Sequence, residues 1–455
     1  MQVTFWGTRG SIASPGPDTL QFGGNTSCVE LRLADEVLIF DCGTGIRALG
    51  NRLLEEGQAQ LKLNLFISHV HWDHIQGFPF FAPLFVEGSE LFVFGPQEQH
   101  QRLSDTMAGQ MQYRYFPVDI DQLAAKIGYQ ELGEERVKVG PATVTTHYLN
   151  HTTLAMGYRV EFGSRSVVYA TDTESFAQQP RAWSDPKRRR FFHRRDEELA
   201  DFFAGADVLI LDSQYNAEEY AAKVGWGHGT FDYSVDLAIS AGVKHLVLFH
   251  HDPNRSDADL RRQVERSQAR ARAEGSQLEI TAAAEHEQLD LPDELSTEAV
   301  SGVHLLPNFV HQVHVGLVGV DSSVEELSRR ALQLTHFKLG SFDSASAFSN
   351  GEWGEFRPHL LLLQYRERGD VARAVEALER NGHRRQVPIL ALVMAGSTNF
   401  MQRAFDEGAT DVMVQPFSPS QLRSRVDTWL FRGGTALDRR RHPRQGEPAA
   451  SEPTE

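Results

Sequence analysis

Residues 61–77 read LKLNLFISHVHWDHIQG, an apolar run followed at once by three histidines and an aspartate. The apolar run predicts a buried β-strand that ends near Ser68. Four side chains that can bind a metal come next: His69, His71, Asp73 and His74. Zinc and iron prefer imidazole and carboxylate ligands, and a loop at the carboxyl end of a strand can bring such groups together. The stretch therefore predicts a metal site at a strand end.

The sequence on both sides of this stretch predicts an α/β domain. Short β-rich runs occupy residues 3–6, 27–33, 36–43, 206–213 and 244–251, and residues 156–172 predict a hairpin that turns at Gly163-Ser164. Residues 233–241 and 257–273 have helical patterns. Two sheet layers covered by helices would bury the apolar side of these elements.

The pattern His-x-His-x-Asp-His resembles the signature of the metallo-β-lactamase superfamily. The other motifs of that family stand in the expected order: Asp41 in IFDCGTG, His151 in LNHTT, Asp172 in YATDTE and His250 in LFHHDP. The resemblance covers residues 1–290. It implies an αββα sandwich and a hydrolase that holds two divalent metal ions, with Zn²⁺ expected and Mn²⁺ or iron as alternatives.

The resemblance also implies a ligand set. His69, His71 and His151 would hold one metal, Asp73, His74 and His250 would hold the second, and Asp172 would bridge the two. His147 is an alternative to His151, and His251 is an alternative to His250, because each lies close by in the sequence. Asp41 is expected to orient a ligand and not to bind a metal.

One branch of the superfamily fits best. Residues 225–253, GWGHGTFDYSVDLAISAGVKHLVLFHHDP, resemble a stretch of ribonuclease-Z-like and class II cyclic-nucleotide phosphodiesterase enzymes. That branch places a carboxylate at Asp172, where the best-known zinc β-lactamases have cysteine. Asp73 and His228 are the candidate catalytic residues, and His228 is placed to give a proton to the leaving oxygen. The alternative is that His228 caps the helix that follows it.

The favoured function is therefore hydrolysis of a small phosphodiester, a cyclic nucleotide first, by a hydroxide that bridges the metals. Three alternatives stay open: RNA processing of the ribonuclease Z type, a diiron redox protein, and a signalling scaffold without activity. Arg9 and Asn25 in the opening loop are free to contact substrate. Residues 113–116 offer an aromatic wall or an ordinary lid, and the basic run 187–195 offers a rim for a polyanion or a solvated loop.

The last third of the chain has a different pattern. Five β-rich runs, at residues 314–320, 337–342, 359–365, 387–394 and 411–414, alternate with helical stretches and predict a doubly wound parallel sheet. This segment resembles the receiver domain of response regulators. Gln364 stands where the family has its phosphate-accepting aspartate, Gln415 replaces its lysine, Val393 its hydroxyl residue, and Asp321 alone remains of its acidic pair. The resemblance thus implies a dimerising or regulatory domain that cannot be phosphorylated. Ser418, Pro419 and Gln421 predict the start of its last helix.

The composition and length of the chain limit the classes of protein to which it can belong. The chain has 455 residues, a formal net charge of −16 and two cysteines, which excludes a disulfide framework and makes nucleic acid a less favoured partner. There is neither a signal-peptide pattern nor a membrane-length apolar run, so a cytoplasmic protein is expected. The expected organisation is a hydrolase domain at 1–291, a linker at 292–303, a receiver-like domain at 304–432 that pairs two copies, and a disordered tail at 433–455.

Overall fold

The computed structural model describes residues 1–438 apart from 35, 58–59, 98–100, 178–192, 293–312, 333–336, 352, 354–355, 383–386 and 395–397. Contacts divide the chain into unit 1, Met1–Asn308, and unit 2, Phe309–Glu455. Most of the expected linker, and the basic residues 187–192, lie outside the described residues. None of the described helices has the length and hydropathy needed to cross a bilayer.

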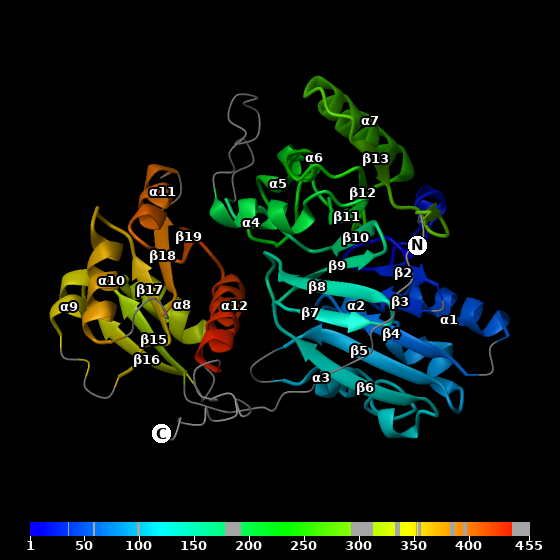
Figure 1. The fold of residues 1–455 in the computed structure, drawn as a ribbon, viewed down its shortest axis with the longest axis horizontal. Helices are drawn as coiled ribbons and strands as arrows, with labels where there is room; N and C mark the ends of the chain where they lie inside the picture. The colour runs from blue at the N-terminus through cyan, green and yellow to red at the C-terminus, as the bar shows by residue number, and fades with distance from the viewer. Residues whose placement is uncertain are drawn as a thin grey trace, which may run out of the picture. The chain divides into compact units, whose positions relative to one another are not determined.

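Unit 1 contains two seven-stranded sheets (Figure 1). The first has the order β14-β1-β2-β3-β4-β5-β6 and consists of β1 (Gln2–Gly7), β2 (Cys28–Leu33), β3 (Glu36–Phe40), β4 (Lys62–Phe66), β5 (Glu90–Pro96), β6 (Lys126–Leu132) and β14 (Gln288–Asp290). The second has the order β13-β12-β11-β10-β9-β8-β7 and consists of β7 (Arg136–Val139), β8 (Ala142–Tyr148), β9 (Met156–Phe162), β10 (Arg165–Ala170), β11 (Val208–Asp212), β12 (His245–Phe249) and β13 (Glu279–Ala282). The predicted hairpin is β9 and β10, which pair antiparallel.

Helices cover the two sheets. The helices on the side of the first sheet are α1 (Ile46–Glu55), α2 (Trp72–Ile75) and α3 (Leu103–Gln110). The helices on the side of the second sheet are α4 (Arg194–Phe203), α5 (Ala217–Tyr220), α6 (Phe231–Ser240) and α7 (Asp257–Ala273). The helix α7 has the bounds that its sequence predicts. Each layer of helices encloses its own apolar cluster against a sheet. The predicted αββα sandwich is therefore confirmed.

Aromatic rings fill the space between the sheets. The ring centroid of Phe40 on β3 lies 5.3 Å from that of Tyr169 on β10, and Tyr169 lies 5.6 Å from Phe249 on β12. Two tyrosine hydroxyls cross between the sheets, since Tyr158 donates to the carbonyl of Ile67 at 2.6 Å and Tyr169 donates to Asp41 at 2.7 Å. Buried aromatic pairs with satisfied hydroxyls are rigid. They fix the strand ends from which the site is built.

Unit 2 is a five-stranded parallel sheet with the order β16-β15-β17-β18-β19. Its strands are β15 (Val313–Val318), β16 (Phe337–Phe342), β17 (Leu360–Gln364), β18 (Ile389–Met394) and β19 (Asp411–Gln415), and its helices are α8 (Ser322–Ala331), α9 (Ala345–Asn350), α10 (Asp370–Arg380), α11 (Thr398–Asp406) and α12 (Pro419–Asp438). This strand order is that of flavodoxin-like doubly wound folds, so the predicted receiver-like architecture is confirmed.

The start of α12 follows the prediction, but its end does not. Ser418 and Gln421 form the expected reciprocal cap, because Gln421 N–H donates to Ser418 Oγ at 3.2 Å and Ser418 N–H donates to Gln421 Oε1 at 2.8 Å. The helix then continues to Asp438, past the expected boundary at 432. The first residues of the expected disordered tail are thus helical, and glycine inside a helix costs only about 1 kcal/mol.

Gln364, at the position where receivers are phosphorylated, is hydrogen-bonded to Gln415, which replaces the lysine of that family. Gln415 Nε2 donates to Gln364 Oε1 at 2.8 Å, and Gln364 Nε2 donates to the carbonyl of Leu392 at 3.2 Å. Asp321 accepts from Val324 N–H at 2.9 Å and serves as the N-cap of α8. The remaining acidic residue is therefore engaged with its own helix. Pairing of two copies through unit 2 stays a prediction.

We expect that incubation of the full chain with acetyl phosphate and Mg²⁺ adds no phosphate to unit 2, because an amide cannot form an acyl phosphate. Intact-mass spectrometry, with a functional receiver domain as the positive control, measures this. A mass increase of one phosphoryl group that maps to residues 309–438 would contradict the prediction.

Candidate metal centre

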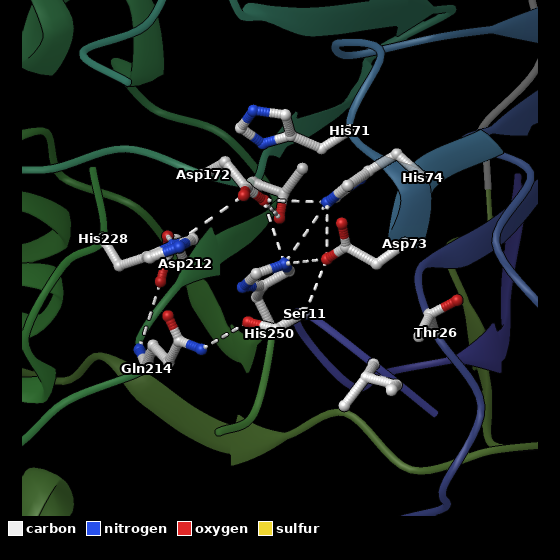
Figure 2. A network of polar contacts seen from close by, with 12 residues as sticks. Ser11, Thr26, His71, Asp73, His74, Asp172, Asp212, Gln214, His228 and His250 are labelled. Atoms are coloured by element: carbon white, nitrogen blue, oxygen red, sulfur yellow. Dashed lines mark hydrogen bonds and ion pairs between the residues drawn. The ribbon is translucent and has the colours of Figure 1, made fainter. Parts of the chain in front are cut away.

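Seven predicted ligands meet where strands of the two sheets end. Parallel strands align their carboxyl ends, as β3 and β4 do in the first sheet and β10, β11 and β12 do in the second. The ligand atoms of these seven residues form two groups whose members lie within 4.8 Å of one another, and a third such group joins Asp172 and His250 to Asp212 and His228. One group is His69, His71, His151 and Asp172. The other is Asp73, His74 and His250, with Asp172 in contact (Figure 2).

The spacing within each group fits a metal ion. In the first group His71 Nδ1 lies 3.0 Å from His69 Nε2 and 3.1 Å from His151 Nε2, and both Nε2 atoms lie 3.6 Å from Asp172 Oδ2. Four tetrahedral ligands about 2.1 Å from a zinc ion are about 3.4 Å apart. The ligand atoms of the first group are therefore spaced as they would be around one metal ion.

The second group has the same dimensions. His74 Nε2 and His250 Nε2 are 3.3 Å apart, and they lie 3.3 Å and 3.2 Å from Asp73 Oδ2. Both nitrogens also lie near Asp172 Oδ1, at 3.3 Å and 3.2 Å. Asp172 thus presents one carboxylate oxygen to each group, which is the arrangement of a bridging ligand. The residues present are consistent with a dinuclear site.

Three residues of the site adopt an unusual backbone conformation. Asp41, Asp172 and His250 have φ values of 60°, 54° and 59°. Side chains other than glycine rarely occupy this left-handed region, which costs about 1–3 kcal/mol per residue. Such strain persists where the surrounding structure fixes the backbone, as the buried aromatic layer does here, and it turns the side chains toward the common centre.

Buried hydrogen bonds orient the imidazoles. Asp41 Oδ2 lies 2.7 Å from His74 Nδ1, and the carbonyl of Gly227 lies 2.8 Å from His151 Nδ1. Both contacts leave Nε2 to face the ligand group. Ser11 N–H donates to Asp73 Oδ2 at 2.6 Å and fixes that carboxylate.

The charges of the site favour a cation. Burial lowers the pKa of His151 to about 3, so its ring is neutral and can bind a metal. For His74, burial alone would lower the pKa, but the carboxylates of Asp73, Asp172 and Asp41 raise it well above its usual value. Three buried carboxylates around one imidazole make a strongly negative field.

A histidine–aspartate pair lies beside the two groups. His228 Nδ1 is 2.8 Å from Asp212 Oδ2 and 3.7 Å from Asp172 Oδ2, and its ring stacks on His250 with centroids 5.0 Å apart (Figure 2). Burial would lower the pKa of His228, but Asp212, with help from Asp172 and Asp73, raises it to about 9. The pair can therefore hold a proton next to the bridging carboxylate.

The sequence did not point to Asp212 or Glu174. Asp212 ends the run LILD as Asp41 ends LIFD, and this parallel was the available signal. The Glu174 carboxylate is buried and accepts three hydrogen bonds: from the Tyr220 hydroxyl at 2.5 Å, from Gly225 N–H at 2.7 Å and from Gly227 N–H at 3.1 Å. Glu174 thus fixes the loop that carries His228.

The structure places the alternative histidines away from the ligand groups. His147 contacts Glu134 at 3.0 Å and stacks on Phe202. His251 Nε2 lies 2.9 Å from the carbonyl of Ala283. Thr230, and not His228, caps α6, because its side chain accepts from Tyr233 N–H at 3.1 Å.

One expectation about the loops requires correction. Arg9 cannot contact substrate, because its guanidinium is fully buried and donates to the carbonyls of Gly23, Asp252 and Arg255. It ties the opening loop to the loop after His250. In the aromatic segment, Phe116 packs on Phe80, whereas Tyr113 and Tyr115 are exposed.

Unit 1 is similar to several known proteins. Residues 37–251 match a family model described as "Beta-lactamase superfamily domain". A ribonuclease Z from Methanothermobacter thermautotrophicus is 26% identical over 278 residues, which cover 55% of this chain and 86% of the relative. The crystal structure of human tRNase Z, short form, is 20% identical, with a TM-score of 0.43, and the match covers 64% of this chain and 100% of that one.

Unit 2 has structural matches of its own. The signal receiver domain of a Luxo repressor protein from Vibrio parahaemolyticus is 13% identical, with a TM-score of 0.25. That match covers 29% of this chain and 99% of the other.

We expect His151→Ala to lose metal and His147→Ala to keep it, because only His151 belongs to a ligand group. Inductively coupled plasma mass spectrometry of the purified variants gives the metal content per chain, and His147→Ala is the matched control. Loss of metal from His147→Ala with full retention in His151→Ala would reverse this assignment.

Proposed function

We propose, because unit 1 belongs to the metallo-β-lactamase superfamily, that this metal-dependent hydrolase acts on phosphodiester bonds, with RNA as its first candidate substrate. The observation that carries the proposal is the His228–Asp212 pair beside the two ligand groups, at 2.8 Å. An alkoxide leaving group needs a proton near neutral pH, and a phosphodiester of a nucleoside has such a leaving group.

Different residues of the chain have different roles in the proposed reaction. Two divalent cations held by the ligand groups would lower the pKa of a water molecule and offset the charge of the phosphate. The hydrogen bond to Asp212 assigns the Nδ1 proton of His228, so Nε2 remains free to hold the proton for the leaving oxygen. Glu174 and the carbonyl of Gly227 keep His228 and His151 in place.

Two observations bear on the substrate class, namely the sequence relatives and the net charge of this chain, and they favour different substrates. The ribonuclease Z relative named above favours RNA processing over the cyclic nucleotides preferred from the sequence. The formal net charge of −16 favours a small substrate over a folded polyanion. Cyclic nucleotides therefore remain the second candidate.

The first helix of unit 2 opposes the diiron redox alternative where that protein would bind a flavin in its doubly wound domain. Binding of a flavin phosphate at the first turn of a doubly wound fold uses the free backbone N–H groups of the helix start. At α8 Asp321 already accepts from Val324 N–H at 2.9 Å, and its negative charge would repel a phosphate. The hydrolase interpretation needs no such group.

A panel of phosphodiesters tests the proposal: bis(p-nitrophenyl) phosphate, a 3′-extended tRNA precursor, cyclic AMP and cyclic GMP. We expect metal-dependent cleavage, fastest for the RNA, and loss of nearly all activity in His69→Ala. Full activity in metal-free protein, or no cleavage of any phosphodiester by metal-loaded protein, would contradict it.

We expect His228→Ala to retain metal but to lose about 10²–10⁴-fold in turnover on substrates with an alkoxide leaving group, the usual effect of general acid catalysis. The loss should be much smaller for p-nitrophenyl esters, whose leaving group needs no proton. Asp212→Asn should show the same pattern to a smaller extent. Equal losses on both types of substrate would instead indicate a structural role.

A further inference from the structure

The loop between α5 and α6 carries an exposed tryptophan next to the histidine–aspartate pair. Trp226 lies two residues before His228, and its side chain is 57% exposed. Its neighbours Gly225 and Gly227 have φ values of 88° and 85°, and both donate their N–H groups to Glu174. The backbone on each side of Trp226 is therefore fixed, so the indole projects from a rigid support.

A cation lies beside this indole. Lys223 Nζ is 5.5 Å from the ring centroid of Trp226, 4.2 Å from that of Tyr215 and 3.4 Å from Asp252 Oδ2. Lys223 is the only lysine or arginine among residues 213–229. Asp252 and the two rings hold the ammonium in place, and on a chain with net charge −16 it is the positive group of residues 213–229 that an anion beside Trp226 would meet.

The Tyr215 ring connects this cation to His228. The ring of His228 meets Tyr215 edge-on with centroids 5.9 Å apart, and the Lys223 ammonium lies over the same tyrosine. Tyr215 itself is buried. His228, Lys223 and Trp226 therefore share one side of the site.

We propose that Trp226 and Lys223 form a subsite for the leaving nucleotide, in which the base stacks on Trp226 and a 5′-phosphate of that nucleotide pairs with Lys223. The assignment rests on the proposed function. During hydrolysis the water oxygen bonds to phosphorus, the bond from phosphorus to O3′ breaks, and the proton of His228 goes to O3′. One proton of the water is released to solvent, from which His228 is protonated again. The nucleoside that carries O3′ must therefore lie on the His228 side, where Trp226 and Lys223 are. Proteins bind single-stranded nucleic acids through aromatic rings, on which the bases stack, and through lysines, which contact the phosphates.

Two dinucleotides that differ by one phosphate test the subsite: ApA and its 5′-phosphorylated form pApA, cleaved by the metal-loaded full chain. We expect Trp226→Ala to raise KM about 5- to 150-fold for both, the usual range for loss of base stacking, and Trp226→Phe to restore most of it. Lys223→Met should raise KM about five-fold for pApA and leave ApA unchanged.

Two matched controls lie in the first sheet and not in the loop between α5 and α6. Phe92→Ala removes an exposed ring on β5, and Lys62→Met removes an exposed lysine at the start of β4, so both should keep the KM values of the original chain. Metal content and circular dichroism confirm that each variant is folded and loaded. Cleavage of both dinucleotides with KM unchanged in Trp226→Ala and Lys223→Met would overturn the subsite and leave the proposed function intact.

If neither dinucleotide is cleaved, equilibrium dialysis with 5′-AMP separates the two proposals. This probe has the free 3′-hydroxyl and the 5′-phosphate of the leaving nucleotide. Binding that weakens in both Trp226→Ala and Lys223→Met, but in neither control, supports the subsite even where the proposed substrate is wrong. Binding that is equal in all variants overturns it.

Discussion

The rest of unit 1 depends on the contacts that the buried carboxylate of Asp41 makes. It accepts from the Ser68 N–H and hydroxyl at 2.7 Å and 2.8 Å, accepts from Tyr169 at 2.7 Å, and lies 2.7 Å from His74. These partners come from both sheets and from the metal-binding loop. An unpaired buried carboxylate would be very unfavourable, so the sheets, the loop and the imidazole must all be in position together. Folding and assembly of the site are thus one event.

Glu174 repeats this principle around a different loop. Its three hydrogen bonds replace the water that a carboxylate would otherwise bind, and they impose one conformation on residues 220–227. The carbonyl of Gly227, held in this way, contacts His151. A carboxylate two residues after the bridging Asp172 therefore determines both a ligand of one group and the position of His228.

The sequence predicted the parts of this protein that follow from periodicity. The strands, the hairpin at Gly163, the bounds of α7 and the cap at Ser418 are local patterns, and the structure has them. Contacts between distant segments could not be read in the same way. Arg9 was expected to be free to contact substrate, but its guanidinium is buried and donates to the carbonyls of Gly23, Asp252 and Arg255. Asp212 looked like an ordinary strand end, since its partner His228 comes 16 residues later and is joined to it only by the fold.

In residues 224–227 two exposed side chains alternate with two glycines whose backbone N–H groups are bound by Glu174. This alternation matters for directed evolution. A Cβ added to Gly227 would lie 2.3 Å from His151 Nδ1, so no other amino acid fits there without displacing that imidazole. Val224 and Trp226 are 40% and 57% exposed. A library that varies these two codons and keeps Gly225 and Gly227 would sample new selectivities while leaving the hydrolytic machinery intact, whereas uniform randomisation of the same segment would consist mostly of inactive clones.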